Sequence, residues 1–276
     1  MRAALLQMTS TPDIAANTAV MEAAVAEAKA GGADMLLTPE VSNCLGAPRA
    51  EQDALLHEEA DDPTLRAVQE AAAAHGLWVL IGSLALKSGD PDGRFANRSF
   101  LIDAGGAVQA RYDKIHMFDV ALSAEETYTE SAAYRPGAEA VLPQTPWGKV
   151  GLSICYDLRF PHLYRALAQA GADILTVPSA FSQPTGRAHW EVLLRARAIE
   201  TGAFVLAPAQ TGVHGESQSG PRATHGHGLA VAPWGEVLLD MGEAPGLAFV
   251  DLDLGQVAAA RRKIAALTHD RSFHGP

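Results

Sequence analysis

The sequence has 276 residues, of which 48% are hydrophobic and 19% are charged, and its 32 acidic and 21 basic residues give a formal net charge of −11. This length and composition are typical of a compact α/β protein with a large core. The acidic balance and the lack of a basic run argue against a nucleic acid or an anionic membrane surface as a partner, and no apolar stretch has the length of a membrane span.

Helices and strands are predicted to alternate along the chain. Helical patterns bounded by glycine or proline predict helices at residues 14–30, 63–75, 161–170 and 188–200. Apolar runs between them predict strands at residues 3–8, 35–38, 77–83, 99–102, 107–112, 150–154, 174–177, 204–207, 228–231, 237–239 and 248–252. This alternation predicts an α/β fold of βαβ type with added hairpins. No linker divides the chain, so we expect one domain over residues 1–276, with a C-terminal tail from about residue 254.

The chain contains only two cysteines, Cys44 and Cys155, which lie far apart in sequence. Such a pair is not a disulfide framework and favours a reducing compartment. The apolar run at the N-terminus is too short for the core of a signal peptide and is better explained as a first strand. We therefore expect the protein to be cytoplasmic.

One segment of the chain resembles another. Residues 31–40 (GGADMLLTPE) and 170–179 (AGADILTVPS) share a glycine turn, an apolar strand, a proline and a final polar residue. Two related βαβ units would place Glu40 and Ser179 at matching strand ends, where open α/β sheets bind ligands. The similarity alone does not establish an internal repeat, because Gly-Ala-Asp is a common sequence before a strand.

The stretch GLSICYDLRFP, residues 151–161, ends an apolar strand in a cysteine that is followed at once by a polar turn. A thiol with an ordinary pKa near 8.5 is mostly protonated at neutral pH and needs activation to act as a nucleophile. The position of Cys155 between a strand and a helix is that of a nucleophile elbow, which leaves a backbone N–H free to face an oxyanion. The alternative is a small buried hydrophobe, which is the commoner fate of a free cysteine.

Two charged residues also follow predicted strands. Burial would raise the pKa of Glu40, so that it could hold or accept a proton near neutral pH. Lys114 could stabilise a tetrahedral intermediate and favour the thiolate of a neighbouring cysteine. Taken alone, each is better explained as a solvated charge, Lys114 beside Asp113 in a loop to which His116 and Asp119 add polarity.

Glu40, Lys114 and Cys155 follow three successive strands. Together they indicate a catalytic site, which none of them indicates alone. Here the chain resembles the nitrilase superfamily of carbon–nitrogen hydrolases over essentially its whole length. The resemblance rests on the motifs TPE, YDKIHMFD, ICYDLRFP and PSAFSQPTGRAHWEVLLRARAIE. The chain looks most like the branch of deaminated-glutathione amidases and ω-amidases, and less like aliphatic nitrilases, carbamoylases and β-ureidopropionases. The resemblance implies a four-layer αββα sandwich that forms a homodimer or a higher homo-oligomer.

The resemblance also implies a mechanism without a metal or an organic cofactor. Cys155 would be the nucleophile, Glu40 the general base and acid, Lys114 the electrostatic stabiliser, and the backbone N–H of Tyr156 a second oxyanion donor. A thioester on the cysteine would split the hydrolysis of an amide to acid and ammonia into two easier steps. The implied substrates are small ω-amides that carry a carboxylate, such as deaminated glutathione or α-ketoglutaramate.

A second glutamate of the family stands six residues before a Pro-Gly, and this position is Glu130 here. The resemblance implies that it orients the lysine and the substrate amide. The residues by themselves do not choose between Glu130 and its neighbours Glu125 and Glu126, since each could be a solvated loop carboxylate.

Relatives of the ω-amidase type bind the substrate's carboxylate with an arginine of the YDxRF segment and with a phenylalanine and a threonine downstream. These positions are Arg159, Phe181 and Thr185 in this chain. A guanidinium group matches the planar fork of a carboxylate. An equally good explanation is that Arg159 pairs with Asp157 or with a carbonyl at a helix end.

The predicted helix 188–200 is amphipathic, and its Glu191 and Arg195 are spaced to pair on the surface. Packing of its apolar face in the core is the simpler explanation, and the resemblance adds a homodimer interface built from helices of this region. Residues 42–50 lack a tyrosine that some ω-amidases have there, so the substrate of those enzymes does not transfer directly.

Three histidines lie in the C-terminal half, His214, His225 and His227, with Asp240 nearby in sequence. Their spacing fits no standard zinc pattern, so we expect no metal site. Gly228 follows the last histidine where relatives have a serine. Two further readings of the whole chain stay open, namely a nitrile or N-carbamoyl hydrolase with the same three catalytic residues, and a catalytically silent binding protein.

Overall fold

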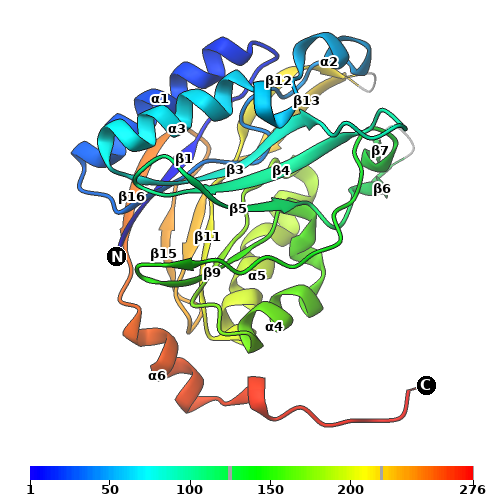
Figure 1. The fold of residues 1–276 in the computed structure, drawn as a ribbon. Helices are drawn as coiled ribbons and strands as arrows, with labels where there is room; N and C mark the ends of the chain where they lie inside the picture. The colour runs from blue at the N-terminus through cyan, green and yellow to red at the C-terminus, as the bar shows by residue number, and fades with distance from the viewer. Residues whose placement is uncertain (124–125, 218–219, 276) are drawn as a thin grey trace.

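The computed structural model describes residues 1–123, 126–217 and 220–275. Two six-stranded sheets pack face to face, and helices cover the outer face of each, so the four layers run αββα as predicted (Figure 1). The first sheet contains, in spatial order, β16 (Gly246–Asp251), β1 (Arg2–Gln7), β2 (Met35–Leu37), β3 (Trp78–Lys87), β4 (Phe95–Ile102) and β5 (Val108–Asp113). The second contains β15 (Val237–Asp240), β14 (Leu229–Val231), β11 (Phe204–Ala207), β10 (Ile174–Thr176), β9 (Gly148–Leu152) and β8 (Gln144–Thr145).

Helices α1 (Ile14–Ala30) and α3 (Pro63–His75) lie side by side over the first sheet (Figure 1). The second sheet is covered by α4 (Pro161–Gln169) and α5 (Gln183–Thr201). The remaining elements are α2 (Arg49–Leu55), α6 (Gly255–Lys263), the short 3₁₀ turns η1 (Glu59–Asp61), η2 (Glu130–Ala132), η3 (Cys155–Arg159) and η4 (Ala266–Thr268), and the two hairpins β6 (Asp119–Ala121) with β7 (Thr127–Thr129) and β12 (Thr211–Ser217) with β13 (Gly220–His225). Within the described residues, no helix is both long enough and apolar enough to cross a bilayer.

Strand β1 illustrates how the sequence builds the layers. Alternate residues of a strand point to opposite faces of its sheet. Ala3 and Leu5 accordingly belong to the core between the two sheets, whereas Ala4 and Leu6 belong to the core beneath α1 and α3. Because both faces are buried, the strand is a continuous apolar run rather than an alternating one.

Local signals set the ends of the first two long helices. The Asp13 carboxylate accepts the N–H of Ala16 at 3.0 Å at the start of α1. Asp62 does the same for Leu65 at the start of α3, which ends at Gly76 in the left-handed conformation. Such caps satisfy backbone groups that the helix itself leaves unpaired. The predicted ranges 14–30 and 63–75 are confirmed.

The prediction for α5 was wrong at its start. The helix was expected from residue 188, but it begins at Gln183 and includes the sequence Gln-Pro-Thr-Gly. Pro184 lies in the first turn, where a missing N–H costs nothing. Gly186 is required by packing, because a Cβ there would lie 2.2 Å from Cγ of His225. Helices α2 and α6 and the hairpin β12–β13 were not predicted.

The two sheets come close together at the ends of their central strands. Strands β1, β2 and β3 run parallel, as do β9, β10 and β11, so the loops that follow β2, β9 and β10 leave the sheets at their carboxyl ends. A Cβ on Gly82 would lie 2.0 Å from the Thr38 carbonyl and 2.4 Å from Pro178. Only glycine fits between these two loops, and the polar residues that follow them therefore meet.

Candidate active site

Cys155 is the first residue of η3, directly after β9 and Ile154, and its side chain is buried. Its φ of 48° lies in the left-handed region, which a residue with a side chain enters only when the surroundings hold it there. Its own N–H donates to the Pro178 carbonyl at 3.0 Å, whereas no acceptor among the described residues takes the N–H of Tyr156. The turn therefore has the geometry of a nucleophile elbow, with one backbone donor left for a ligand.

The Glu40 carboxylate is buried and held from three directions. Its Oε1 accepts hydrogen bonds from Nζ of Lys114 at 2.8 Å and from Nδ2 of Asn97 at 2.9 Å. Its Oε2 accepts the N–H of Ala180 at 2.8 Å, and the carboxylate also interacts with the Cys155 thiol. Since Oε1 has two donors and Oε2 only one, Oε2 is the oxygen with a lone pair left for a proton.

Lys114 is only 2% exposed, so the alternative of a solvated lysine beside Asp113 is wrong. Its Nζ donates to Glu40 and also to both oxygens of Glu130, at 2.9 and 2.8 Å. Asp113 is instead bound by the guanidinium of Arg98 at 2.6 Å. The ammonium group is thus fixed between two carboxylates, beside the cysteine.

The contacts of Glu130 distinguish it from the neighbouring acidic residues. Besides Lys114, its carboxylate accepts the backbone N–H of Phe118 at 2.6 Å. Glu126 only accepts a hydrogen bond from Tyr128 at 3.0 Å, and Glu125 lies outside the described residues. Of the two that are described, Glu130 is the one that contacts the buried lysine.

The charges of this cluster determine which groups are ionised. Burial disfavours the Glu40 carboxylate, but the charge and hydrogen bond of Lys114 outweigh it and hold its pKa below the usual range. Burial likewise opposes the Lys114 ammonium, yet Glu130 and Glu40 raise its pKa. Burial and then the charge of Glu40 raise the pKa of Cys155, although Lys114 acts the other way. The resting site therefore holds two carboxylates, one ammonium and a neutral thiol. The expected rise of the Glu40 pKa was wrong, because burial comes together with a paired cation.

The comparisons with known proteins identify the family of the chain. The model of the carbon–nitrogen hydrolase family matches residues 2–262. The chain belongs to the carbon–nitrogen hydrolase family. The resemblance inferred from the sequence motifs is thereby confirmed, and with it the assignment as a hydrolase of carbon–nitrogen bonds.

Individual members of this family are similar over nearly the whole chain. The chain is 41% identical to the deaminated glutathione amidase of Homo sapiens, over 97% of its own length and 81% of the human protein. The structure of the NitFhit protein of C. elegans matches with a TM-score of 0.89 and 36% identity over 98% of this chain, which spans 65% of the NitFhit chain. The amidase of Nesterenkonia sp. AN1 matches with a TM-score of 0.77 and 28% identity, over 96% of this chain and 98% of that one. In a glutamate-to-glutamine mutant of that amidase, acrylamide has added to the active-site cysteine.

Asn97 was not predicted from the sequence, although it contacts two of the charged residues. Its Nδ2 donates to Glu40 at 2.9 Å and lies 3.3 Å from Oε1 of Glu130. The signal was an amide in the middle of the buried strand β4, where an apolar residue is expected. Asn97 holds the two carboxylates on either side of the lysine in one arrangement.

The three residues expected to bind a carboxylate only partly come together. The guanidinium of Arg159 lies 5.4 Å from the centre of the Phe181 ring. Its Nη2 lies 3.2 Å from Nδ1 of His189, and Arg159 makes no ion pair with Asp157, so that alternative is wrong. Thr185 instead hydrogen-bonds Ser182 at 2.7 Å within the first turn of α5.

The histidines form no metal site among the described residues. His214 is buried between the Ser10 carbonyl at 2.8 Å and the Thr224 hydroxyl at 2.6 Å, and burial lowers its pKa to about 4. His227 instead lies 2.9 Å from Asp240. A Cβ on Gly228 would lie 2.9 Å from Sδ of Met241, so this glycine packs closely against the methionine side chain.

Replacing Lys114 with methionine is expected to lower the free energy of unfolding by about 3–5 kcal/mol at neutral pH, because the buried Glu40 carboxylate and the partly buried Glu130 carboxylate lose their cation. Without the cation, burial is unopposed by Lys114 and raises the folded-state pKa of Glu40 above its unfolded value. Folding of the variant then takes up protons, so its loss of stability relative to the wild type becomes smaller as the pH falls. Urea unfolding at neutral and mildly acidic pH measures both effects.

The matched control is Lys149→Met, because Lys149 is a lysine whose Nζ bonds the Ala170 carbonyl at the surface. This variant should lower the free energy of unfolding only slightly at either pH. An equal deficit for Lys114→Met at both pH values, or one no larger than that of the control, would contradict the prediction.

Proposed function

We propose that the protein hydrolyses the amide of a small metabolite that carries a carboxylate, through a thioester on Cys155. The observation that carries the proposal is the buried contact of Glu40, Lys114 and Cys155, followed directly by the N–H of Tyr156, which has no acceptor among the described residues. It is supported by the similarity to proteins named deaminated glutathione amidase. The proposed reaction uses no metal and no organic cofactor.

The first half of the reaction acylates the thiol. Oε2 of Glu40 takes the proton of Cys155 as Sγ attacks the carbonyl carbon, so that no free thiolate has to form beside two carboxylates. The negative charge lost from Glu40 reappears on the carbonyl oxygen, where Lys114 and the N–H of Tyr156 stabilise it. The total charge of the site stays constant. The C–N bond then breaks, and the nitrogen leaves with the proton held by Glu40.

The second half releases the acid. Water attacks the thioester while Glu40 accepts one of its protons, the C–S bond breaks, and this proton returns to Sγ. Glu130 and Asn97 keep Lys114 and Glu40 in place throughout, because their hydrogen bonds do not involve the reacting atoms. The site returns to its starting protonation state, so it can turn over.

The proposal is tested by the formation of acid from a panel of amides. The panel contains α-ketoglutaramate, deaminated glutathione, a simple nitrile and an N-carbamoyl amino acid. The first two share one acyl group, so one assay of 2-oxoglutarate detects both, whether ammonia or a peptide leaves. Product from either supports the proposal. Product only from the nitrile or the carbamoyl compound replaces it with the corresponding activity, and no product from any member points to a binding protein.

Arg159 is proposed to bind the carboxylate of the substrate, with Phe181 beside it and Thr185 one turn into α5. Replacing Arg159 with methionine should raise KM about 10- to 100-fold, the value of one charge-assisted hydrogen bond, with a smaller change in kcat. Steady-state kinetics on a carboxylate-bearing amide measures this. An uncharged amide of the same length is the control, and its KM should not change. An equal effect on both amides would show that Arg159 acts on the fold instead.

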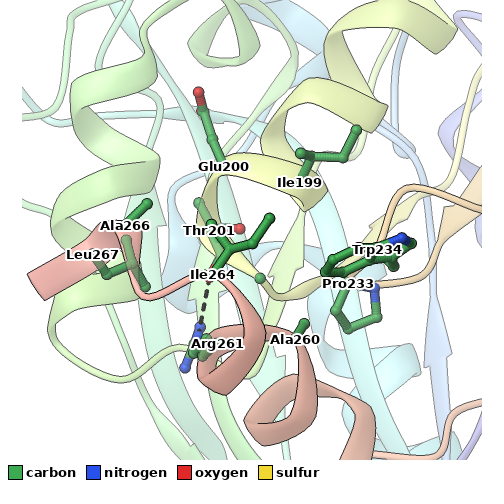
Figure 2. Close-up of a pocket in the computed structure, with 11 residues that line it drawn as sticks. Ile199, Glu200, Thr201, Pro233, Trp234, Ala260, Arg261, Ile264, Ala266 and Leu267 are labelled. Carbon is green, nitrogen blue, oxygen red and sulfur yellow. Dashed lines mark hydrogen bonds between the residues drawn. The ribbon is translucent and has the colours of Figure 1, made fainter. Parts of the chain in front are cut away.

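A homodimer is proposed on the basis of exposed apolar residues on the second half of α5 and on the segments next to its end. The exposed fraction is 68% for Val192, 55% for Ile199, 50% for Trp234 and 59% for Ile264. Figure 2 shows three of them around one cavity of about 220 Å³ between α5 and α6. Exposed apolar area of this kind is typical of subunit interfaces.

In the same proposal the protein is cytoplasmic, and residues 1–276 form one domain with a tail from about residue 254.

Replacing Ile199 with glutamate should convert the dimer to a monomer, because a buried charge at the centre of the interface has no partner. Sedimentation equilibrium at micromolar concentration measures the mass. The matched control is Val20→Glu, since Val20 is a half-exposed residue of α1 on the opposite side of the sandwich. A monomeric wild-type protein would refute the proposed dimer.

A further inference from the structure

The carboxylate of Asp157 collects four hydrogen bonds next to the proposed nucleophile. Asp157 stands two residues after Cys155 and is completely buried. Its Oδ1 accepts the backbone N–H of His116 at 3.0 Å and faces Nδ1 of the same residue at 2.7 Å. Its Oδ2 accepts the hydroxyl of Tyr112 at 2.6 Å and the N–H of Ile154 at 2.8 Å. The mechanism described above does not use this group.

These hydrogen bonds connect two loops that carry different parts of the site. His116 stands two residues after Lys114, and Asp157 stands two residues after Cys155. The same loop continues to Phe118, whose N–H binds Glu130. The His116 imidazole, together with its own backbone N–H and the Tyr112 hydroxyl, therefore ties the segment that holds the ammonium and its carboxylate partner to the turn that holds the thiol.

The imidazole of His116 has a fixed orientation. It stacks on the ring of Phe160, with centroids 3.5 Å apart and planes at 7°, and meets the edge of His162 at 5.7 Å. Because Oδ1 of Asp157 already accepts one N–H and a carboxylate only accepts, the ring nitrogen that faces it carries a hydrogen. The ring thus presents one donor in one direction.

The turn at Cys155 needs support of this kind. Its left-handed φ of 48° is unfavourable for a residue with a side chain, so contacts from outside the turn must hold it. Asp157 connects the turn to such contacts, since it belongs to the turn itself, binds Ile154 before the cysteine and accepts a hydrogen bond from His116 of the other loop. Small displacements of a nucleophile from its oxyanion donors and its base cost large factors in rate.

We infer that His116 is a positioning residue, which acts through Asp157 to hold the thiol of Cys155 and the N–H of Tyr156 at a set distance from Lys114. The inference rests on the proposed function of these residues. His116 itself reaches no reacting atom in this role. It should therefore govern the rate of the acylation step much more than the binding of substrate.

Three substitutions at His116 separate the donor from the ring. His116→Asn places an amide nitrogen where Nδ1 lies, and so keeps the donor but loses the stack on Phe160. His116→Phe keeps a ring on Phe160 but has no donor. His116→Gln carries the same amide one bond too far, in the position of Nε2. All three are compared with the wild type by kcat, KM and melting temperature on the best amide of the panel.

We expect His116→Phe and His116→Gln to lower kcat about 10- to 100-fold with KM nearly unchanged, and His116→Asn to recover to within a few-fold of wild type. Val25→Ala is the stability control, because Val25 is a buried residue of α1 in the core on the far side of the first sheet. It should lower the melting temperature to a similar degree without lowering kcat.

Three results would overturn the inference. They are a wild-type kcat in His116→Phe, a loss in His116→Asn as large as in His116→Phe, and a loss of kcat in Val25→Ala that matches its loss of stability. Failure of the proposed function is detected separately. If Cys155→Ala keeps full activity, the function itself is wrong, whereas an inactive Cys155→Ala beside a normal His116→Phe removes only the positioning role.

Discussion

Replacing Cys155 with alanine is expected to abolish amide hydrolysis, with a residual rate at least about 10⁴-fold below that of the wild type. The thiol is the only group of the buried cluster that can form the covalent intermediate, and Glu40 has no other proton to take from a nucleophile there. Because alanine removes a single atom from a closely packed turn, the fold should remain. The production of 2-oxoglutarate and the melting temperature measure the two effects.

The second cysteine of the chain is the natural control. Cys44 is also buried and also carries a neutral thiol, since burial raises its pKa to about 11, but it lies on no charged group of the site. Cys44→Ala should keep activity within a few-fold of wild type. Rapid quench during turnover should then show an acyl adduct on Cys155 and none on Cys44. Full activity in Cys155→Ala together with the absence of an adduct would refute the thioester mechanism.

Replacing Glu40 with glutamine is expected to have two opposite effects. Hydrolysis should fall about 10²- to 10⁴-fold, because the general base is lost while the shape of the side chain is kept. The pKa of the Cys155 thiol should fall, because the negative charge of Glu40 raises it in the wild type and Lys114 then acts unopposed by that carboxylate. The variant should therefore form the thiolate at a lower pH than the wild type.

The pH profile of alkylation by iodoacetamide, followed by mass spectrometry on Cys155, measures this shift. In the wild type the thiol is protonated well beyond neutral pH, so the rate should keep rising as the pH increases, and in Glu40→Gln the rise should begin earlier. Glu126→Gln is the control, since Glu126 bonds Tyr128 and does not contact the cysteine. A profile that is unchanged, or displaced to higher pH, would contradict the assignment of Glu40. The acrylamide adduct in the glutamate-to-glutamine mutant of the Nesterenkonia amidase shows that the cysteine of that relative still reacts.

The secondary structure was predictable where local signals were strong. Asp13, Asp62 and Gly76 act within one turn of the backbone, so the ends of α1 and α3 follow from neighbouring residues alone. The start of α5 was missed by five residues, and the missed segment contains Pro184 and Gly186, which have low helix propensity. Gly186 is acceptable only because His225 packs against it, and that contact comes from a distant hairpin. Local propensity cannot reveal such a compensation.

The residues of the candidate site could be predicted from the sequence, but most of the contacts between them could not. Glu40, Lys114 and Cys155 all follow strands, and the carboxyl ends of parallel strands meet, so their proximity could be expected. The direction of the Glu40 pKa shift was wrong. Burial can be judged from an apolar strand, but the opposing effect depends on an ammonium 2.8 Å away, and that distance exists only after two loops have packed.

The α/β class, the family motifs and the identity of the three residues proposed to act on the amide followed from the sequence alone, because each lies in a local pattern that the neighbouring residues define. Only the tertiary structure decided the charge states of Glu40 and Cys155, the support that Asn97 gives to the carboxylates, and the contact between His116 and Asp157. These depend on distances between segments far apart in the chain, and electrostatic and hydrogen-bond energies change steeply with those distances.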